Sequence, residues 1–107
     1  MVMCTYFLSS THSSSKEILE ALRSVVNPLQ FNKNCIKTGI WVNADDPGSI
    51  LVFEIWKNMA ELEKYVQSAF YKRMLEVIEM SSEKPEIRFS DCETALGLEW
   101  LEKVIVA

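Results

Sequence analysis

The chain has 107 residues and a formal net charge of −4 at pH 7, and 49% of its residues are hydrophobic. This length predicts one globular domain, residues 1–107, with a sizeable core, and the composition excludes extended disorder. The 11 basic residues are scattered among 15 acidic ones, so a nucleic-acid-binding surface is not expected.

The first apolar run, Val2–Leu8, alternates along its length and predicts a strand. It is too short for a signal peptide or a membrane span, so no membrane association is expected. Both faces of this strand are largely apolar, so both need to be covered. One face carries Val2, Cys4, Tyr6 and Leu8, and the other carries Met3, Thr5 and Phe7.

A polar loop, residues 9–15, precedes the first predicted helix, Lys16–Val26. Ser14 is a candidate N-cap, and Glu17 stands three residues further on, as in a capping box. Apolar residues recur at helical spacing on one side, which predicts that this helix packs on a sheet. Pro28 ends the helix, because a residue that precedes proline disfavours helical geometry.

Two further strands are predicted, Asn34–Asn43 and Ile50–Trp56, and the short turn between them favours antiparallel pairing. Gly48 lies in this turn and is expected to supply a positive φ. Because side chains alternate along a strand, Cys35 is expected on the same face as Trp41.

Two consecutive helices are predicted after the third strand. Asn58 is the candidate N-cap of the first, and Glu61 stands at the capping-box position. Ser68 offers a second helix start, and apolar residues follow at helical spacing as far as Met80. A fourth strand is predicted over Glu86–Cys92.

The order strand, helix, strand, strand, helix, strand predicts an α+β fold of the ferredoxin-like βαββαβ type. In this fold a four-stranded antiparallel sheet carries helices on one side. Residues 93–107 form a C-terminal extension. Its apolar spacing favours a short helix that packs on its own or on a neighbouring subunit, although Lys103–Val106 would also suit a strand.

The second face of the predicted sheet, which the helices do not cover, also needs to be buried. Strands that are apolar on both faces would expose more contiguous apolar surface than monomers usually do. We therefore expect a homodimer in which a second copy of the chain covers this face. The alternative is that the C-terminal segment folds back over the sheet of its own chain.

The residues around Trp56 resemble a known family. E-I-W-K-N-M-A-E-L-E-K-Y, residues 54–65, with the later F-Y-K-R, is similar to a segment of the antibiotic biosynthesis monooxygenase (ABM) family that runs E-x-W-x-s-x-x-a-l-x-x-H. P-E-I-R-F and G-L-E-W-L-E-K-V resemble the tail of one uncharacterised branch. The resemblance implies a dimeric α/β barrel, in which two such sheets pack face to face.

The same resemblance implies a cofactor-independent monooxygenase, in which a quinol or polyphenol-type aromatic, once deprotonated, passes an electron to oxygen. Tyr65 stands where many members have histidine, and Val52 and Ile50 flank the strand face where quinone-forming members use asparagine. Haem-degrading relatives hold iron through a histidine on the helix equivalent to Ala69–Met80. This helix has no histidine, so haem is not expected.

Four aromatic side chains are candidate walls of a ligand-binding cleft between sheet and helices: Trp41, Trp56, Tyr65 and Phe70. They would suit a flat aromatic ligand held by stacking, and each is alternatively an ordinary core residue. Tyr65 and Glu54 are the catalytic candidates, Tyr65 as a hydrogen-bond donor. Glu54 is either an acid whose pKa is raised in a dry cleft, or a structural residue that pairs with a lysine or arginine or lies at the sheet edge.

Motifs of other enzyme classes are absent: there is no G-x-G-x-x-G, H-E-x-x-H or G-x-S-x-G. The only histidine, His12, is interpreted as a solvated loop residue, and Cys4, Cys35 and Cys92 lack zinc-site spacing, so no metal is expected. The thiols are interpreted as small core residues that stay reduced in a cytoplasmic protein.

Two functions remain open at this point. One is the monooxygenase, and the other is a non-enzymatic dimer on the same fold that binds a small ligand or another partner. A core in which Trp56 and Tyr65 contact each other would leave no room for a substrate and would favour the second.

Overall fold

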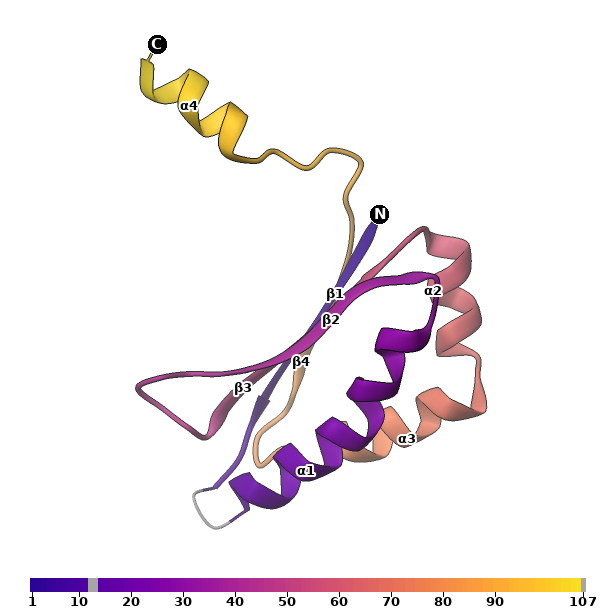
Figure 1. Ribbon diagram of the computed structural model, residues 1–107. Coiled ribbons are helices and arrows are strands. Elements are labelled where there is room, and N and C mark those ends of the chain that lie inside the picture. Colours follow the sequence, from indigo (N-terminus) through magenta and orange to yellow (C-terminus); the bar gives the residue numbers. More distant parts are fainter. Residues whose placement is uncertain (12–13, 107) are drawn as a thin grey trace.

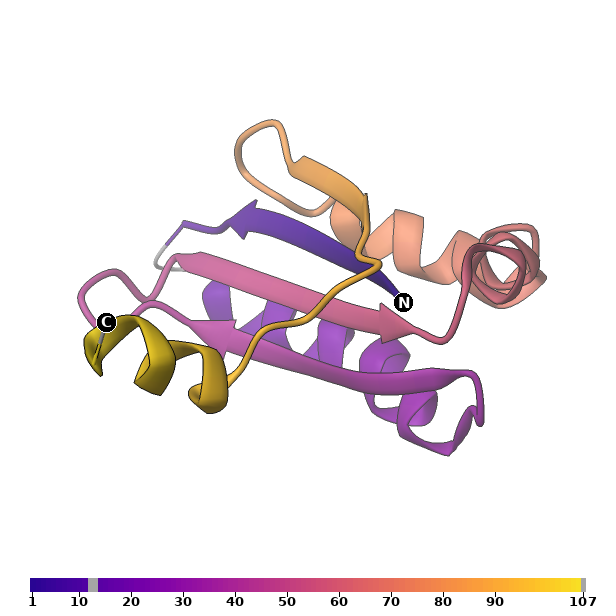
Figure 2. The same cartoon turned by 90° about the horizontal axis from the view of Figure 1, so that it is seen from above.

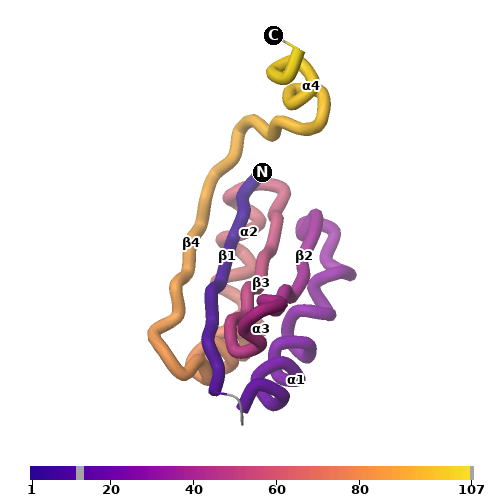
Figure 3. Tube along the Cα trace, turned by 90° about the vertical axis from the view of Figure 1, so that its left-hand side faces the viewer, coloured from indigo at the N-terminus to yellow at the C-terminus, as the bar shows by residue number. Residues whose placement is uncertain are grey.

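The computed structural model describes residues 1–11 and 14–106, so the interpretation of His12 lies outside the described residues. Over these ranges the four strands form one antiparallel sheet in the order β2-β3-β1-β4 (Figure 3). This is the predicted ferredoxin-like α+β fold. The elements are β1 (Val2–Ser9), α1 (Ser15–Val26), the 3₁₀ helix η1 (Asn27–Phe31), β2 (Cys35–Val42), β3 (Ser49–Trp56), α2 (Met59–Val66), α3 (Ala69–Ile78), β4 (Glu86–Asp91) and α4 (Leu98–Val106).

The hydrophobic core lies between the sheet and one layer of helices, α1, α2 and α3 (Figure 1). Burial alternates along β1 and β3 as the sequence predicts, because successive side chains point to opposite faces. The helix-facing set is Val2, Cys4, Tyr6 and Leu8 in β1, and Ile50, Val52, Glu54 and Trp56 in β3. All of these except Glu54 are apolar or aromatic, so the carboxyl group of Glu54 is the exception that needs partners.

β2 departs from the predicted alternation. Its pairing with β3 shifts between Cys35 and Lys37, which is a β-bulge. Cys35 pairs with Trp56 and is buried on the helix side, whereas Trp41 pairs with Leu51 and lies on the other face. The prediction that Cys35 and Trp41 share a face is therefore wrong, because the extra residue of the bulge reverses the alternation.

The turn between β2 and β3 closes against the end of β1. The Ser10 N–H donates to the carbonyl oxygen of Gly48 at 2.7 Å, and a Cβ atom on Gly48 would collide with the Ser10 carbonyl oxygen. No described glycine has a positive φ, so the predicted positive φ at Gly48 is wrong. Glycine fits here because another stretch of backbone approaches closely.

α1 begins after Ser14, but the predicted capping box with Glu17 is not formed. The Ser14 side chain makes no capping hydrogen bond, and its hydroxyl donates to the carbonyl oxygen of Thr11 at 3.3 Å. Its backbone, at φ −108° and ψ −1°, lacks the extended geometry typical of an N-cap. α1 ends at Val26, and the chain continues as η1 with Pro28 in the first turn.

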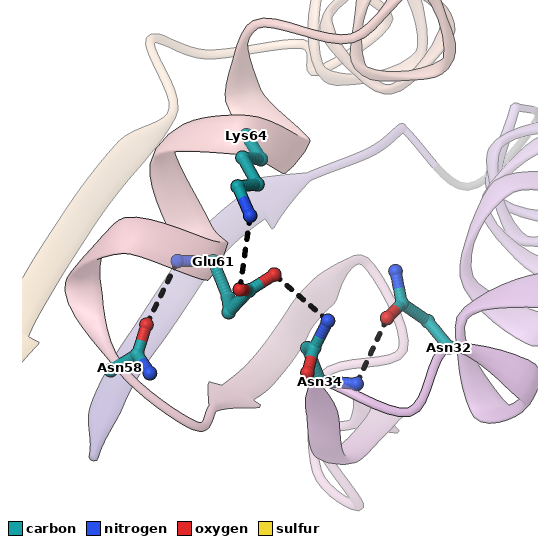
Figure 4. Close-up of polar contacts among 5 residues, drawn as sticks. All are labelled: Asn32, Asn34, Asn58, Glu61 and Lys64. Atoms are coloured by element: carbon teal, nitrogen blue, oxygen red, sulfur yellow. Dashed lines mark hydrogen bonds and ion pairs between the residues drawn. The ribbon is translucent and has the colours of Figure 1, made fainter.

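α2 begins at its predicted cap. The side-chain oxygen of Asn58 accepts from the N–H of Glu61 at 2.9 Å (Figure 4). The carboxylate of Glu61 does not complete a capping box: it accepts from the side-chain amide of Asn34 at 2.8 Å and pairs with Lys64 at 3.3 Å. Glu61 therefore connects the start of α2 to the segment before β2. The serine predicted to start α3 also caps that helix.

The C-terminal extension leaves the sheet at the end of β4 and carries α4 (Figures 1 and 2). α4 lies beyond the side of the sheet opposite to α1, α2 and α3, and none of its residues is buried. The chain here is helical rather than extended over Lys103–Val106, and it does not fold over its own sheet. Six large apolar side chains of α4 are exposed: Leu98, Trp100, Leu101, Val104, Ile105 and Val106.

The sheet face away from α1, α2 and α3 is called the open face. It is largely apolar across β2, β3 and β1, where Lys37 and Thr5 are polar exceptions, and it is polar along β4. Its large apolar members are Met3, Phe7, Trp41, Leu51, Phe53 and Ile55. Trp41 is 61% exposed and packs against Phe53, with 6.3 Å between ring centroids.

Candidate functional site

The carboxyl group of Glu54 lies at the centre of a buried polar cluster. Its Oε1 accepts from the hydroxyl of Tyr6 at 3.2 Å and from the indole Nε1–H of Trp56 at 3.1 Å. Its Oε2 accepts from the hydroxyl of Tyr65 at 3.2 Å. Glu54 itself is 0% exposed, so these three neutral donors, rather than water, satisfy the carboxyl group.

The secondary structure brings these donors together. Glu54 and Trp56 are two residues apart on β3, so both point towards the helices. Tyr6 lies on the neighbouring β1, one diagonal step from Glu54, since Cys4 is the residue directly opposite. Tyr65 is a buried residue of the last turn of α2 and approaches the carboxyl group from the helix layer.

A third hydroxyl extends the cluster. Tyr71, on α3, lies with its oxygen 3.1 Å from the oxygen of Tyr6. Because Tyr6 has one hydroxyl hydrogen and donates it to Glu54, Tyr71 is the donor of this second bond. The rings of Tyr71 and Tyr65 also meet edge to face, with 4.9 Å between centroids.

Burial controls the proton affinity of this cluster. Desolvation raises the pKa of Glu54, and the hydrogen bonds from Trp56, Tyr65 and Tyr6 oppose that rise. Burial and the nearby carboxyl group also raise the pKa values of Tyr6 and Tyr65. Desolvation raises the pKa of Tyr71 as well. The four groups therefore favour their neutral forms more strongly than the same groups do in water.

The two structural interpretations of Glu54 are wrong. β3 lies inside the sheet, between β2 and β1, so Glu54 is not at a sheet edge. Its partners are a tryptophan and two tyrosines, so it does not pair with a lysine or arginine. A buried acid with a raised pKa is the interpretation that fits, and sites of this kind often carry function.

A cleft of about 350 Å³ adjoins the cluster. It lies between η1, the end of β3, α2 and the start of α3. Trp56 and Tyr65 belong both to its wall and to the donor set of Glu54, and Phe70 forms part of the lining. The other lining residues are Pro28, Leu29, Asn32, Glu61, Lys64 and Ser68.

Trp56 and Tyr65 stack on each other, with 4.5 Å between ring centroids and 26° between ring planes. This separation leaves no slot for an aromatic ligand between the two rings. The cleft lies beside the stacked pair rather than within it. Contact between Trp56 and Tyr65 is the arrangement that was expected to favour a non-enzymatic dimer, and a ligand in the cleft could meet this pair only from the side that lines the cleft.

The predicted cleft residues are not all brought together. Trp56, Tyr65 and Phe70 line one cleft, whereas Trp41 lies on the open face and cannot share it. Phe70 is half-buried, and the guanidinium carbon of Arg73 lies 5.8 Å from its ring centroid. The strand position of Trp41 suited either face, and its pairing with Leu51 places it on the open face.

Sequence reasoning missed Tyr6 and Tyr71, and it missed the polar rim of the cleft. The rim consists of Asn32, Glu61 and Lys64, with Asn34 behind it (Figure 4). One signal was present: Tyr6 lies on a core-facing strand position, and a buried carboxyl group needs hydrogen-bond donors. Polar surface residues such as Asn32 carry no comparable signal.

Residues 1–11 and 14–106 contain neither a group of potential metal ligands nor a helix that could cross a membrane. No group of three or more His, Cys, Asp or Glu side chains in these ranges is placed to hold a metal ion. Within the same ranges, no helix combines the length and the apolar character that a bilayer crossing requires.

Solved structures share the fold with low sequence identity. A proposed antibiotic biosynthesis monooxygenase from Deinococcus radiodurans aligns with a TM-score of 0.81 and 14% identity, over 92% of this chain and 98% of that one. Rv0793 from Mycobacterium tuberculosis aligns with a TM-score of 0.76 and 14% identity, over 90% and 98% of the two chains. A conserved protein from Methanosarcina mazei Go1 gives 0.74 and 17%, over 83% and 89%.

The sequence itself identifies the family. A search of curated proteins finds no match. The model of the ABM family, antibiotic biosynthesis monooxygenase, matches residues 1–77, from β1 through most of α3. Because this match spans well over half of the chain, the chain belongs to the antibiotic biosynthesis monooxygenase family.

Proposed function

We propose that this protein is a cofactor-independent monooxygenase that acts on a small hydroxylated aromatic of the quinol or polyphenol class. The observation that carries the proposal is that Trp56 and Tyr65 join a cleft of about 350 Å³ to a buried carboxyl group. A cleft of this size is within the range that accepts small ligands. Family membership supports the reaction type.

Each part of the cleft has a chemical task in this reaction. The substrate ring packs against Phe70, the half-buried aromatic residue of the lining, because Trp56 and Tyr65 are only 1% and 6% exposed. The polar rim, with Glu61 and Lys64, binds ring hydroxyls. Tyr65 contacts the substrate hydroxyl and is not itself the base, because burial raises its pKa and its one hydrogen is donated to Glu54. Glu54 accepts the substrate proton, and the deprotonated ring then passes an electron to oxygen.

A second function is favoured by one specific observation. Trp56 stacks directly on Tyr65, so an aromatic substrate cannot be enclosed between two rings and is held on one side only. In this second function the protein would bind a small aromatic ligand in the same cleft without catalysing its oxidation. The two functions share the cleft and differ in whether oxygen is consumed.

Oxygen uptake with a panel of hydroquinones separates these functions. For the enzyme, we expect uptake by the wild type and a loss of about tenfold in Trp56→Phe and in Tyr65→Phe, since each removes one hydrogen bond to Glu54. Trp41→Phe is the matched control, because Trp41 lies on the open face, and it should leave uptake unchanged. Binding without uptake for every hydroquinone would favour the binding protein, and neither binding nor uptake would contradict both.

The same proposal includes a homodimer formed through the open face. Met3, Phe7 and Trp41 are exposed there, and a stable interface typically buries roughly 800 Å² per partner. The six exposed apolar residues of α4 extend this apolar surface, because α4 lies on the same side of the sheet (Figure 1). A second copy of the chain would cover both surfaces, and a cytoplasmic location would keep the three free thiols reduced.

A further inference from the structure

A continuous line of hydrogen-bonding oxygens runs from α3 to the wall of the cleft. Its steps are 3.1 Å from Tyr71 to Tyr6, 3.2 Å from Tyr6 to Oε1 of Glu54, and 3.2 Å from Oε2 to the hydroxyl of Tyr65. Four elements contribute one residue each: α3, β1, β3 and α2. The line therefore connects the cleft to a carboxyl group that has no contact with solvent.

We propose that ligand binding in the cleft is coupled to protonation of Glu54, and that Tyr6 and Tyr71 are the positioning residues that set how strongly Glu54 takes up the proton. This inference rests on the proposed function, because it assumes a ligand with an ionisable hydroxyl in this cleft. It adds the route of the proton, the oxygen of Glu54 that receives it, and two residues that do not line the cleft.

The two oxygens of Glu54 have different environments. Oε1 accepts from two donors, the hydroxyl of Tyr6 and the indole N–H of Trp56. Oε2 accepts from Tyr65 alone. Neither donor of Oε1 can deliver a proton from the ligand, because an indole nitrogen is only a donor and Tyr6 does not line the cleft. Oε2 is therefore the oxygen that takes up the proton, through the hydroxyl of Tyr65 in the cleft wall.

The proton moves in two linked transfers. The ligand O–H bond breaks and its proton passes to the hydroxyl oxygen of Tyr65, while the original hydrogen of Tyr65 passes to Oε2 of Glu54. The ligand ends as a phenolate, Glu54 ends as a neutral acid, and Tyr65 is unchanged. Tyr65 then donates to the ligand oxygen and accepts from Oε2, so both of its hydrogen bonds are reversed in direction and retained.

Other ionisable groups that face Glu54 do not compete for this proton at neutral pH. Burial raises the pKa of Cys4, on β1, to about 12 and that of Cys35, on β2, to about 11. The phenols of Tyr6, Tyr65 and Tyr71 are likewise held neutral by burial. Among these groups a carboxyl group has the lowest ordinary pKa, so Glu54 is the member of the cluster that serves as the proton acceptor.

Tyr6 and Tyr71 act on Glu54 without touching the ligand. Tyr6 donates to the carboxylate and so stabilises its charged form, which lowers the proton affinity of Glu54. Tyr71 donates to Tyr6 and strengthens Tyr6 as a donor in turn. Removing either hydroxyl should therefore move the protonation of Glu54 to higher pH, and the effect of Tyr6 should be the larger.

The first test uses Trp56 as a reporter, because its indole N–H donates directly to Glu54. In a Trp41→Phe/Trp100→Phe background, Trp56 is the only tryptophan, and its fluorescence is followed against pH. We expect one transition that Glu54→Gln abolishes. Tyr6→Phe should raise its midpoint by about one pH unit, the effect of one hydrogen bond to a charged group. Tyr71→Phe, which removes a single hydroxyl from a residue one step further away, should raise it by less.

The second test uses 4-nitrocatechol, whose phenolate is coloured, in weakly buffered solution near neutral pH. We expect it to bind as the phenolate with a net uptake of protons from the solvent, because part of the free ligand is already ionised near neutral pH while each Glu54 gains a full proton. Tyr65→Phe should abolish this ionisation while leaving the Trp56 transition in place. Failure of the hydroquinone assay alone, with both of these results obtained, would refute turnover and leave the proton coupling intact.

Three results would overturn the coupling. One is a Trp56 transition that survives Glu54→Gln. Another is a midpoint that neither Tyr6→Phe nor Tyr71→Phe displaces. The third is 4-nitrocatechol that fails to bind, binds un-ionised, or binds while its proton appears in the solvent.

Discussion

At the scale of single residues, Glu54 differs from every other described acid in being fully buried. Three neutral donors hold its carboxyl group, and they offset only part of the desolvation, so its pKa is raised. A raised folded-state pKa means that the native protein binds the proton more tightly than the unfolded chain does. The stability that this proton supplies is fully present below the unfolded pKa, about 4.3.

Glu54→Gln should therefore change how stability depends on pH. As the pH rises from about 4.5 towards the folded pKa of Glu54, the wild type should lose stability relative to Glu54→Gln, by up to about 1.4 kcal/mol per pH unit. Urea unfolding of both proteins across this range measures the difference. Glu76→Gln is the matched control, because Glu76 is exposed on α3, and it should follow the wild type. Parallel curves for wild type and Glu54→Gln would contradict the buried-acid interpretation.

At the scale of elements, side-chain caps decide where the helices of the cleft begin. α2 has only eight residues, and Asn58 satisfies one of its free N–H groups at 2.9 Å. Glu61, in the first turn of the same helix, contacts Asn34 and Lys64 and forms part of the cleft rim. The start of α2 therefore affects both stability and the shape of the cleft.

Asn58→Ala should lower the free energy of unfolding by about 1 kcal/mol, because it removes the cap. Asn58→Ser keeps an acceptor oxygen and should restore most of that loss. Ser14→Ala is a useful comparison, since Ser14 also precedes a helix but makes no capping hydrogen bond, and it should cost less than Asn58→Ala. Chemical denaturation measures all three, and an equal cost for Asn58→Ala and Ser14→Ala would contradict the assignment.

At the scale of the whole molecule, the open face and α4 both present apolar surface on the side away from the cleft-forming helices (Figures 1 and 2). If a second copy covers them, sedimentation at micromolar concentration should give twice the chain mass of 12.3 kDa. A mass near that of one chain would refute the dimer.

A charged residue on the open face tests where the dimer forms. Trp41→Glu should shift the equilibrium towards the monomer, because it places a carboxylate in the apolar interface. Leu75→Glu is the matched control: Leu75 is an exposed apolar residue on α3, away from the open face, and its replacement should leave the dimer intact. Equal dissociation by both variants would show that the open face is not the interface.

The sequence by itself determined the features that depend on residues near one another in the chain. Alternation along Val2–Leu8 and Ile50–Trp56 predicted which side chains face the helices, because the period of a strand is a property of its own backbone. The cap at Asn58 and the order of elements followed from equally short-range patterns. These are enough for the ferredoxin-like fold.

Contacts between distant segments were decided only by the tertiary structure. Trp41 was assigned to the cleft but lies on the open face, because it pairs with Leu51, whose side chain points away from the helices. Tyr6 and Tyr71 are 65 positions apart and meet only because β1 and α3 pack together over Glu54. A sequence can indicate that a buried carboxyl group needs donors, but which donors reach it depends on the register of strands and the docking of helices. Those in turn depend on packing across the whole core.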